Sequence, residues 1–142
     1  MDKFELARLE CARQHAIGKE ENFLDGLTFA EESIFRHTVV HFRPLMLLGS
    51  LVEERNNGCR SVNAVFNQGN MALEPEKIER QLKLLIDAWN EGVLSIDEFC
   101  KEFLLIHPFC DGNGRVASIL YNVLQRKDGE NYEMLPYYFG NE

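Results

Sequence analysis

A short run in the second half of the chain constrains its fold and its function more than any other stretch. It reads I-H-P-F-C-D-G-N-G-R-V-A-S from Ile106 to Ser118. The proline after His107 pushes that histidine away from the α region, so one helix should end there. The glycines on either side of Asn113 allow a tight turn that a ligand can approach closely, and an apolar helical pattern follows. The sequence therefore predicts a loop that presents backbone N–H groups at a helix N-terminus, which is a site for anions.

The side chains of this loop indicate chemistry at phosphorus. His107 is a candidate general base, because imidazole titrates near neutral pH. Asp111 is an oxygen ligand suited to Mg²⁺ bound together with phosphates. Asn113, the N–H groups that follow it and the planar cation of Arg115 can hold phosphate oxygens. By itself His107 would be interpreted as a helix cap, but its spacing before Asp111 in a glycine-marked loop favours catalysis.

The segment H-P-F-C-D-G-N-G-R resembles the signature of Fic (Fic/Doc) domains, H-P-F-x-[DE]-G-N-G-R-x-x-R, over nine unbroken positions. The resemblance implies a nucleotidyltransferase that moves AMP from Mg-ATP to a Ser, Thr or Tyr hydroxyl of a target protein. It implies that His107 deprotonates this hydroxyl and that Asp111 helps to bind Mg²⁺. The phosphate-binding residues that it implies are Gly112, Asn113, Gly114 and Arg115.

The chain departs from the family pattern at Ser118, where the final arginine is expected. In the family this arginine usually contacts the distal phosphate, and in many members it pairs with an inhibitory glutamate. The uncharged serine leaves three alternatives open: weaker ATP binding, a donor with a different distal end, or lost activity. T-F-A-E-E-S from Thr28 to Ser33 approximates the inhibitory motif [ST]-x-x-x-E-[GN], with Glu32 as its glutamate, but a helix capping box explains the same residues. We therefore expect no internal restraint, or restraint by a separate inhibitor protein.

Length, charge and cysteine usage limit the class of protein. The 142 residues, of which 45% are hydrophobic and 27% charged, suit a single globular domain over 1–142. A net charge of −8 argues against nucleic acid as the main partner. We find neither a signal-peptide pattern nor a run of transmembrane length, and the four cysteines show no C-x-x-C spacing. We therefore expect a cytoplasmic protein with reduced thiols and no membrane partner.

Apolar periodicity predicts mostly helices. One helix is expected from Met1 to about Ala16, and a capping box at Thr28–Glu31 should open a second, which Pro44 kinks or restarts. These N-terminal helices occupy residues 1–56. Further helices are expected from Pro75 to Gly92, from the capping box at Ser95–Glu98 to Ile106, and after the motif up to Gly129.

Residues 60–66 alternate in polarity and precede a turn-rich stretch, which predicts a short hairpin. The predicted class is therefore all-α: a Fic-like helical bundle with a small β-hairpin flap before the motif helices. Its core spans about 58–128, and an irregular aromatic tail covers 129–142. From the residues alone, this hairpin can be purely structural or can bind a target segment along its exposed edge. The resemblance favours a target protein that pairs with the edge at 60–66 and so places its hydroxyl before His107.

Other interpretations of single residues and of the whole chain stay open. His37 and His41 lie four apart and can share a metal, but without a third ligand we interpret them as surface or interhelical residues. Cys110, close to His107, is interpreted as a bystander thiol. The alternatives to AMP transfer are another donor, kinase-like phosphoryl transfer, or a catalytically silent module that binds nucleotide or a partner. The intact His107 favours an enzyme, whereas Ser118 favours the silent module. The base of the nucleotide would lie near the flap and Tyr121 or Asn122.

Overall fold

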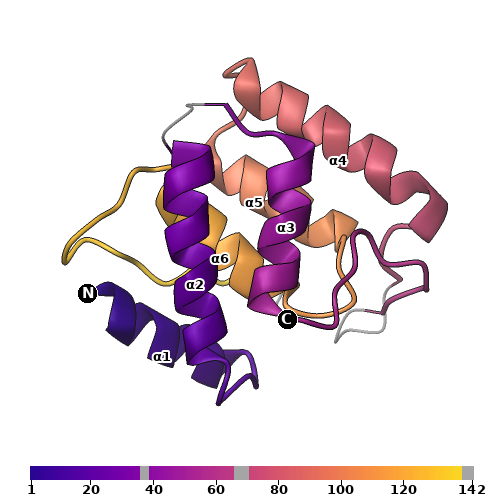
Figure 1. The fold of residues 1–142 in the computed structure, drawn as a ribbon. Helices are drawn as coiled ribbons and strands as arrows, with labels where there is room; N and C mark the ends of the chain where they lie inside the picture. The colour runs from indigo at the N-terminus through magenta and orange to yellow at the C-terminus, as the bar shows by residue number, and fades with distance from the viewer. Residues whose placement is uncertain (36–38, 66–70, 139–142) are drawn as a thin grey trace.

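The computed structural model describes residues 1–35, 39–65 and 71–138, and the regular elements in them are helical (Figure 1). The elements are α1 (Lys3–Arg13), α2 (Glu20–Ala30), the short π-helix η1 (Glu31–Phe35), α3 (Phe42–Val52), α4 (Pro75–Asn90), α5 (Ile96–Ile106) and α6 (Asn113–Val123). The predicted all-α class is confirmed. None of the helices in this part of the chain has the length and apolarity needed to cross a bilayer.

Helix α6 is the central element. It packs against α1, α2, α3 and α5, and Figure 1 shows it crossing behind α2 and α3. Every residue of α6 except Tyr121 is buried. Small residues allow this enclosure: a Cβ on Gly26 of α2 would already lie 3.2 Å from the Ile119 side chain. Because the loop that was predicted to bind anions leads directly into α6, this buried helix fixes the position of the loop.

The elements on either side of the loop follow local sequence signals. Helix α5 begins with the predicted capping box: Ser95 Oγ accepts the Glu98 N–H at 3.1 Å, and the Glu98 carboxylate accepts the Ser95 N–H at 2.9 Å. It ends before His107, as the following proline predicts. Helix α4 has Pro75 in its first turn and buries an aliphatic stripe, which consists of Ile78, Leu82, Leu85 and Ile86.

The capping box predicted at Thr28 is wrong. Helix α2 already begins at Glu20 and runs through Thr28 to Ala30. Its buried face, which includes Phe23 and Leu27, starts one turn before Thr28, so packing against the core sets the start of the helix. Pro44 stands in the first turn of α3, which begins at Phe42. It therefore restarts a helix, one of the two outcomes predicted for it.

The predicted hairpin flap does not form as a pair of strands among the described residues. The pairing there is one antiparallel bridge between Val65 and Met71, with a 2.9 Å hydrogen bond from the Ala72 N–H to the Ala64 carbonyl. The carbonyls of Val62 and Leu73, which lie within and beside this segment, accept hydrogen bonds from the Arg60 guanidinium. The Arg60 side chain thus forms hydrogen bonds that backbone N–H groups of a neighbouring strand would form in a β-ladder. Residues 66–70, the expected turn, lie outside the described residues.

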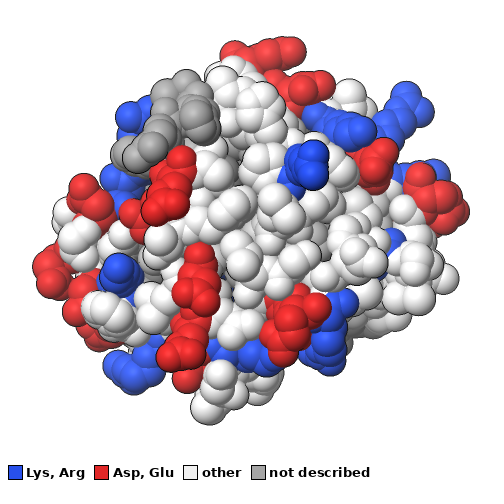
Figure 2. Space-filling model, viewed as in Figure 1, with Lys and Arg blue, Asp and Glu red and all other residues white. Residues whose placement is uncertain are grey.

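The C-terminal segment is irregular, as predicted, and it packs back onto α1 and α6. Tyr132 and Leu135 are buried. The backbone N–H of Leu135 donates to the carboxylate of Glu10 on α1 at 2.9 Å, and the Asn122 side chain of α6 bonds to the backbone of Glu133. On the face drawn in Figure 2, acidic and basic side chains are interspersed over the elements.

Candidate functional site: a phosphate-sized cavity beside a histidine

His107 stands where α5 turns into the loop. Its backbone is left-handed, with φ of 54°, which is uncommon for a residue with a side chain. Its N–H still donates to the Phe103 carbonyl at 3.0 Å and closes the helix. Gly112, at the other end of the loop, is also left-handed, with φ of 80°, and caps α6. The loop therefore leaves α5 and enters α6 through two sharp turns that frame residues 107–112.

Two residues within the motif anchor the loop. The buried side chain of Asn113 accepts the Phe109 N–H at 2.9 Å and donates to the Phe109 carbonyl at 2.8 Å. The buried Phe109 ring lies directly over Gly49 of α3, where an added Cβ would be 2.4 Å from the ring. Phe109 is therefore a structural anchor of the loop. The Asn113 side chain braces the loop, and its predicted contact with phosphate stays a prediction.

Two further residues hold the loop from outside the motif. Buried Asn56 donates to the carbonyls of Gly49 at 3.0 Å and Asp111 at 2.8 Å. Buried Arg60 donates from its backbone to the Pro108 carbonyl at 2.8 Å and from its guanidinium to the His107 carbonyl at 2.6 Å. Sequence reasoning missed both roles, since it placed Asn56 at the end of the N-terminal helices and Arg60 in the flap.

The His107 imidazole is held in its neutral form. Burial lowers its pKa to about 4, and the nearby cation of Arg60 acts in the same direction. A hydrogen bond to the backbone of Leu104 and the charge of Asp111 oppose this effect. A neutral imidazole that donates one N–H to a backbone carbonyl keeps its second nitrogen as an acceptor. The chemistry of a general base is therefore available at neutral pH.

A cavity of about 90 Å³ lies beside His107. Since a water molecule occupies roughly 30 Å³ of liquid, the cavity suits a small polyatomic anion. Its lining brings together all the site residues that the sequence predicted and adds Gln14 from α1; the full set is Gln14, His107, Cys110, Asp111, Gly112, Asn113, Gly114 and Arg115. The N-terminus of α6 forms part of this wall and favours negative charge.

Among the described residues of this lining, Arg115 is the cationic side chain, and it is 3% exposed. Its guanidinium donates to the Val52 carbonyl at 3.2 Å and lies 3.7 Å from the Glu53 carboxylate and 3.6 Å from Asp111. The Glu53 carboxyl is buried, and its pKa is lowered to about 2, first by its hydrogen bond from Arg55. The charge of Arg115 is thus matched by carboxylates before any anion binds.

Asp111 suits a metal that arrives with its ligand. Its carboxylate is 52% exposed and lies 2.6 Å from the Arg55 guanidinium, while its second oxygen accepts the Gly112 N–H at 2.8 Å. Within the described residues no three His, Cys, Asp or Glu side chains cluster as metal ligands. One accessible carboxylate fits Mg²⁺, which commonly takes one or two carboxylates together with phosphates and water.

The remaining candidates lie apart from the cavity. Ser118 is fully buried in α6 and does not line it. Glu32 is exposed in η1, and Asn122 is committed to the backbone of Ser118 and Glu133. His37 lies outside the described residues, so its predicted relation to His41 cannot be followed in the structure.

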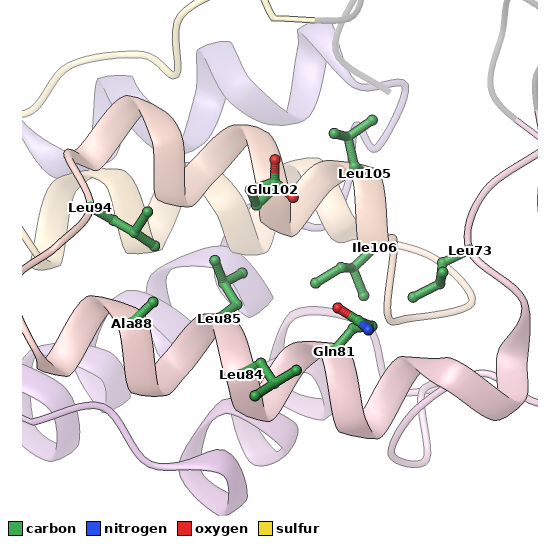
Figure 3. Close-up of a pocket in the computed structure, with 9 residues that line it drawn as sticks. All are labelled: Leu73, Gln81, Leu84, Leu85, Ala88, Leu94, Glu102, Leu105 and Ile106. Atoms are coloured by element: carbon green, nitrogen blue, oxygen red, sulfur yellow. The ribbon is translucent and has the colours of Figure 1, made fainter.

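A second, larger cavity lies between α4 and α5 (Figure 3). It measures about 340 Å³ and is lined mainly by aliphatic side chains; its members are Leu73, Gln81, Leu84, Leu85, Ala88, Leu94, Glu102, Leu105 and Ile106. In Figure 3, Leu85 points from α4 towards α5. One end reaches Leu73 and Ile106, whose carbonyls both bind the Arg60 guanidinium. Arg60 therefore binds the backbone at this end of the apolar cavity as well as the backbone of the histidine loop.

The fold and the loop together define a helical domain in which a cavity joins a helix N-terminus to a neutral histidine. The sequence model of the Fic/DOC family matches residues 36–125. The chain therefore belongs to the Fic/DOC family, and the resemblance of its motif is confirmed at the level of the family.

Curated relatives and solved structures agree with this assignment. The chain is 37% identical over 71 residues to protein adenylyltransferase fic-1 of Caenorhabditis elegans, and the match covers 45% of this chain and 14% of that protein. The fic-1 of Caenorhabditis briggsae is 33% identical over 69 residues, covering 44% and 14%. A Fic-domain-containing signaling protein of Bacteroides thetaiotaomicron shares the fold, with a TM-score of 0.59 at 18% identity over 75% of this chain and 46% of that one. The chain thus spans about a seventh of the length of these curated relatives.

Proposed function

We propose that the chain is a Fic-type nucleotidyltransferase that moves AMP from ATP to a hydroxyl group of a target protein. The observation that carries this proposal is one cavity shared by His107 and the N-terminus of α6. An acceptor for a proton and a cradle for phosphate therefore lie side by side. The names of the two Caenorhabditis relatives support adenylyl transfer as the reaction.

The residues of the chain have distinct parts in this reaction. The neutral imidazole of His107 accepts the proton of the target hydroxyl. The hydroxyl oxygen then forms a bond to the α-phosphorus of ATP, the bond from that phosphorus to the bridging oxygen breaks, and pyrophosphate leaves. The N–H groups of Gly114 and its neighbours stabilise the charge on the phosphoryl oxygens, and Arg115 adds a cation. When bound, Mg²⁺ held by Asp111 and the phosphates would neutralise part of that charge.

The target is proposed to bind partly along the edge at residues 60–66. Val62 and Val65 there are more than half exposed, and Arg60 connects this segment to the His107 carbonyl at 2.6 Å. A chain lying on this edge would pass close to the histidine.

The unpaired thiols support a cytoplasmic setting, and the exposed position of Glu32 supports control by a separate inhibitor protein.

The test is transfer of label from nucleotides. The purified protein is incubated with Mg²⁺ and each α-³²P-labelled NTP, alone and with lysate, beside His107→Ala and the control His41→Ala, an exposed histidine at the start of α3. We expect label from ATP, lost by at least about 100-fold in His107→Ala and kept in His41→Ala. Equal labelling by His107→Ala and the wild type would rule out the proposed base.

A second candidate is the same transfer from another phosphate-containing donor. The uncharged, buried Ser118 favours it, because the cavity contains a single cation, Arg115, to hold a polyphosphate. Label from a different NTP would identify such a donor. Label only from γ-³²P-ATP would indicate phosphoryl transfer, and no label from any nucleotide would favour a non-nucleotide donor or a silent binding module.

A further inference from the structure

One residue outside the motif lines the phosphate-sized cavity. Gln14, at the C-terminal end of α1, faces it together with His107 and residues 110–115. All the other lining residues come from the loop and from the first turn of α6. The packing of α1 against α6 brings Gln14 to this place from the far end of the chain.

A buried acidic residue lies next to Gln14. Glu10, one turn earlier on α1, is fully buried. Its carboxylate pairs with Arg13 and accepts the Leu135 N–H at 2.9 Å. The carboxamide nitrogen of Gln14 lies 3.4 Å from the same carboxylate, which is long for a hydrogen bond. This is the side-chain bond that Gln14 makes within the described residues, so one N–H of the amide is available to a ligand in the cavity.

A phosphate in the cavity would need a hydrogen-bond donor on the side where Gln14 lies. Ser118, which stands where the family pattern has an arginine, is fully buried and is not part of the wall. Arg115 lies close to Glu53 and Asp111, so its positive charge is already balanced. A neutral donor facing the N-terminus of α6 would add a contact to phosphate without burying a further charge.

We propose that Gln14 is a phosphate-binding residue of this protein. Its Nε2–H donates to an oxygen of the polyphosphate chain held at the N-terminus of α6. The identity of this ligand rests on the proposed function. No proton moves at a carboxamide, so the role of Gln14 is binding, and helix α1 becomes part of the nucleotide site.

Binding measurements with two probes test this role. The affinities of the wild type for MgATP and for inorganic pyrophosphate are measured by calorimetry beside Gln14→Met, which keeps the length of the side chain and removes its donors. A hydrogen bond to a charged group predicts about tenfold weaker binding of both probes. The control is Gln81→Met, an exposed glutamine on α4 that lines the other cavity, and it should bind both probes as the wild type does.

A gain of affinity separates this role from a structural one. Gln14→Arg places a cation beside the phosphates, so we expect binding several-fold tighter than in the wild type and more sensitive to salt. A misfolded protein cannot show this gain. Affinities of Gln14→Met and Gln14→Arg that match the wild type would overturn the proposal. If ATP labels a target but Gln14→Met binds like Gln81→Met, only this inference fails. If no nucleotide labels a target and Gln14→Met still weakens pyrophosphate binding, the proposed function fails and the phosphate contact stands.

Discussion

Glu53 and Arg115 are both nearly fully buried beside the cavity, 3.7 Å apart. Removing two charges from water is costly unless they compensate each other. Glu53 also contacts Lys19 and Arg55, so a single carboxylate neutralises cations from three parts of the chain. We infer that Glu53 sets how much of the Arg115 charge is left to attract a phosphate.

Glu53→Gln tests this charge balance. The variant leaves Arg115 buried with less compensation, so we expect a loss of roughly 3 kcal/mol in the free energy of unfolding at pH 7. The control is Glu54→Gln, because Glu54 is exposed and contacts Lys19 and Asn22 at the surface; it should leave stability close to the wild-type value. Urea denaturation provides both values, and equal effects of the two variants would contradict the argument.

The wild type and Glu53→Gln should also differ in how their stability depends on pH. The folded-state pKa of Glu53 lies at about 2, lower than its ordinary value of 4.5. A lowered carboxyl pKa stabilises the fold above the ordinary value, and this contribution is lost as pH falls from about 4.5 to 2. Wild-type stability should therefore decline across this window, and Glu53→Gln should lack the part of the decline that Glu53 causes. Parallel pH profiles would show that Glu53 is not responsible.

The pKa of His107 predicts how the proposed activity depends on pH. Because burial and Arg60 lower this pKa from 6.5 to about 4, the imidazole stays a proton acceptor well into the acid range. We expect kcat/KM for label transfer to keep its pH 7 value down to about pH 5 and to fall only as pH approaches 4. NMR titration of the His107 ring, with His41 as an exposed reference, measures the pKa directly. An activity that halves near pH 6.5 would show that the ring is not shielded in this way.

Among the elements, α3 positions the loop through a single close contact. The Phe109 ring lies where a side chain at Gly49 would be, so α3 and the loop can meet only if this position has no Cβ. Phe103 of α5 packs on the other side, with ring centroids 6.4 Å apart. The ring is thus held between two helices and cannot move aside easily.

Gly49→Ala should therefore destabilise the protein and displace the loop. The added Cβ would lie 2.4 Å from the ring, and we expect a loss of about 3 kcal/mol in stability with much weaker pyrophosphate binding. Gly26→Ala is the comparison, because its Cβ would lie 3.0–3.2 Å from buried methyl groups of α3 and α6, a smaller overlap that the helix preference of alanine, about 1 kcal/mol, partly offsets. A Gly49→Ala protein as stable as Gly26→Ala would contradict this account of the contact.

The elements also show how far the sequence alone could lead. The start of α5 and its end before His107 were predictable, since the capping box and the proline act over a few neighbouring residues. The left-handed backbone of His107 was not, because the rule for a residue before proline favours the extended region. The start of α2 was not, because a buried face that begins before Thr28 outweighs a local capping signal. In the site, residues 107–115 were found as one contiguous motif. Asn56, Arg60 and Gln14 were missed because they reach the loop from distant segments, and polar residues that bind backbone or face a cavity leave no periodic signal.

At the scale of the whole molecule, the two described ends of the chain are joined. The amino group of Met1 donates to the Glu130 carbonyl at 2.7 Å, and Arg13 donates to the Leu135 carbonyl at 2.9 Å. Figure 1 shows the yellow tail passing close to the start of α1. The tail thereby contacts Glu10, whose carboxylate also lies beside the amide nitrogen of Gln14. Folding of the C-terminal segment is therefore coupled to the position of α1 and, through α1, to the cavity.

Two neighbours in the tail allow this coupling to be measured. Leu135 is 1% exposed, whereas Tyr137 is 71% exposed. Leu135→Ala should lower the free energy of unfolding by about 2–4 kcal/mol, because it removes buried methyl groups and leaves a cavity, whereas Tyr137→Ala should cost less than about 1 kcal/mol. Native-state hydrogen exchange locates the effect: amides of α1 should lose protection in Leu135→Ala, while those of α4, which packs on α3 and α5, should change least. Equal loss of protection in α1 and α4 would mean that the tail stabilises the fold as a whole and does not specifically hold α1 against the phosphate site.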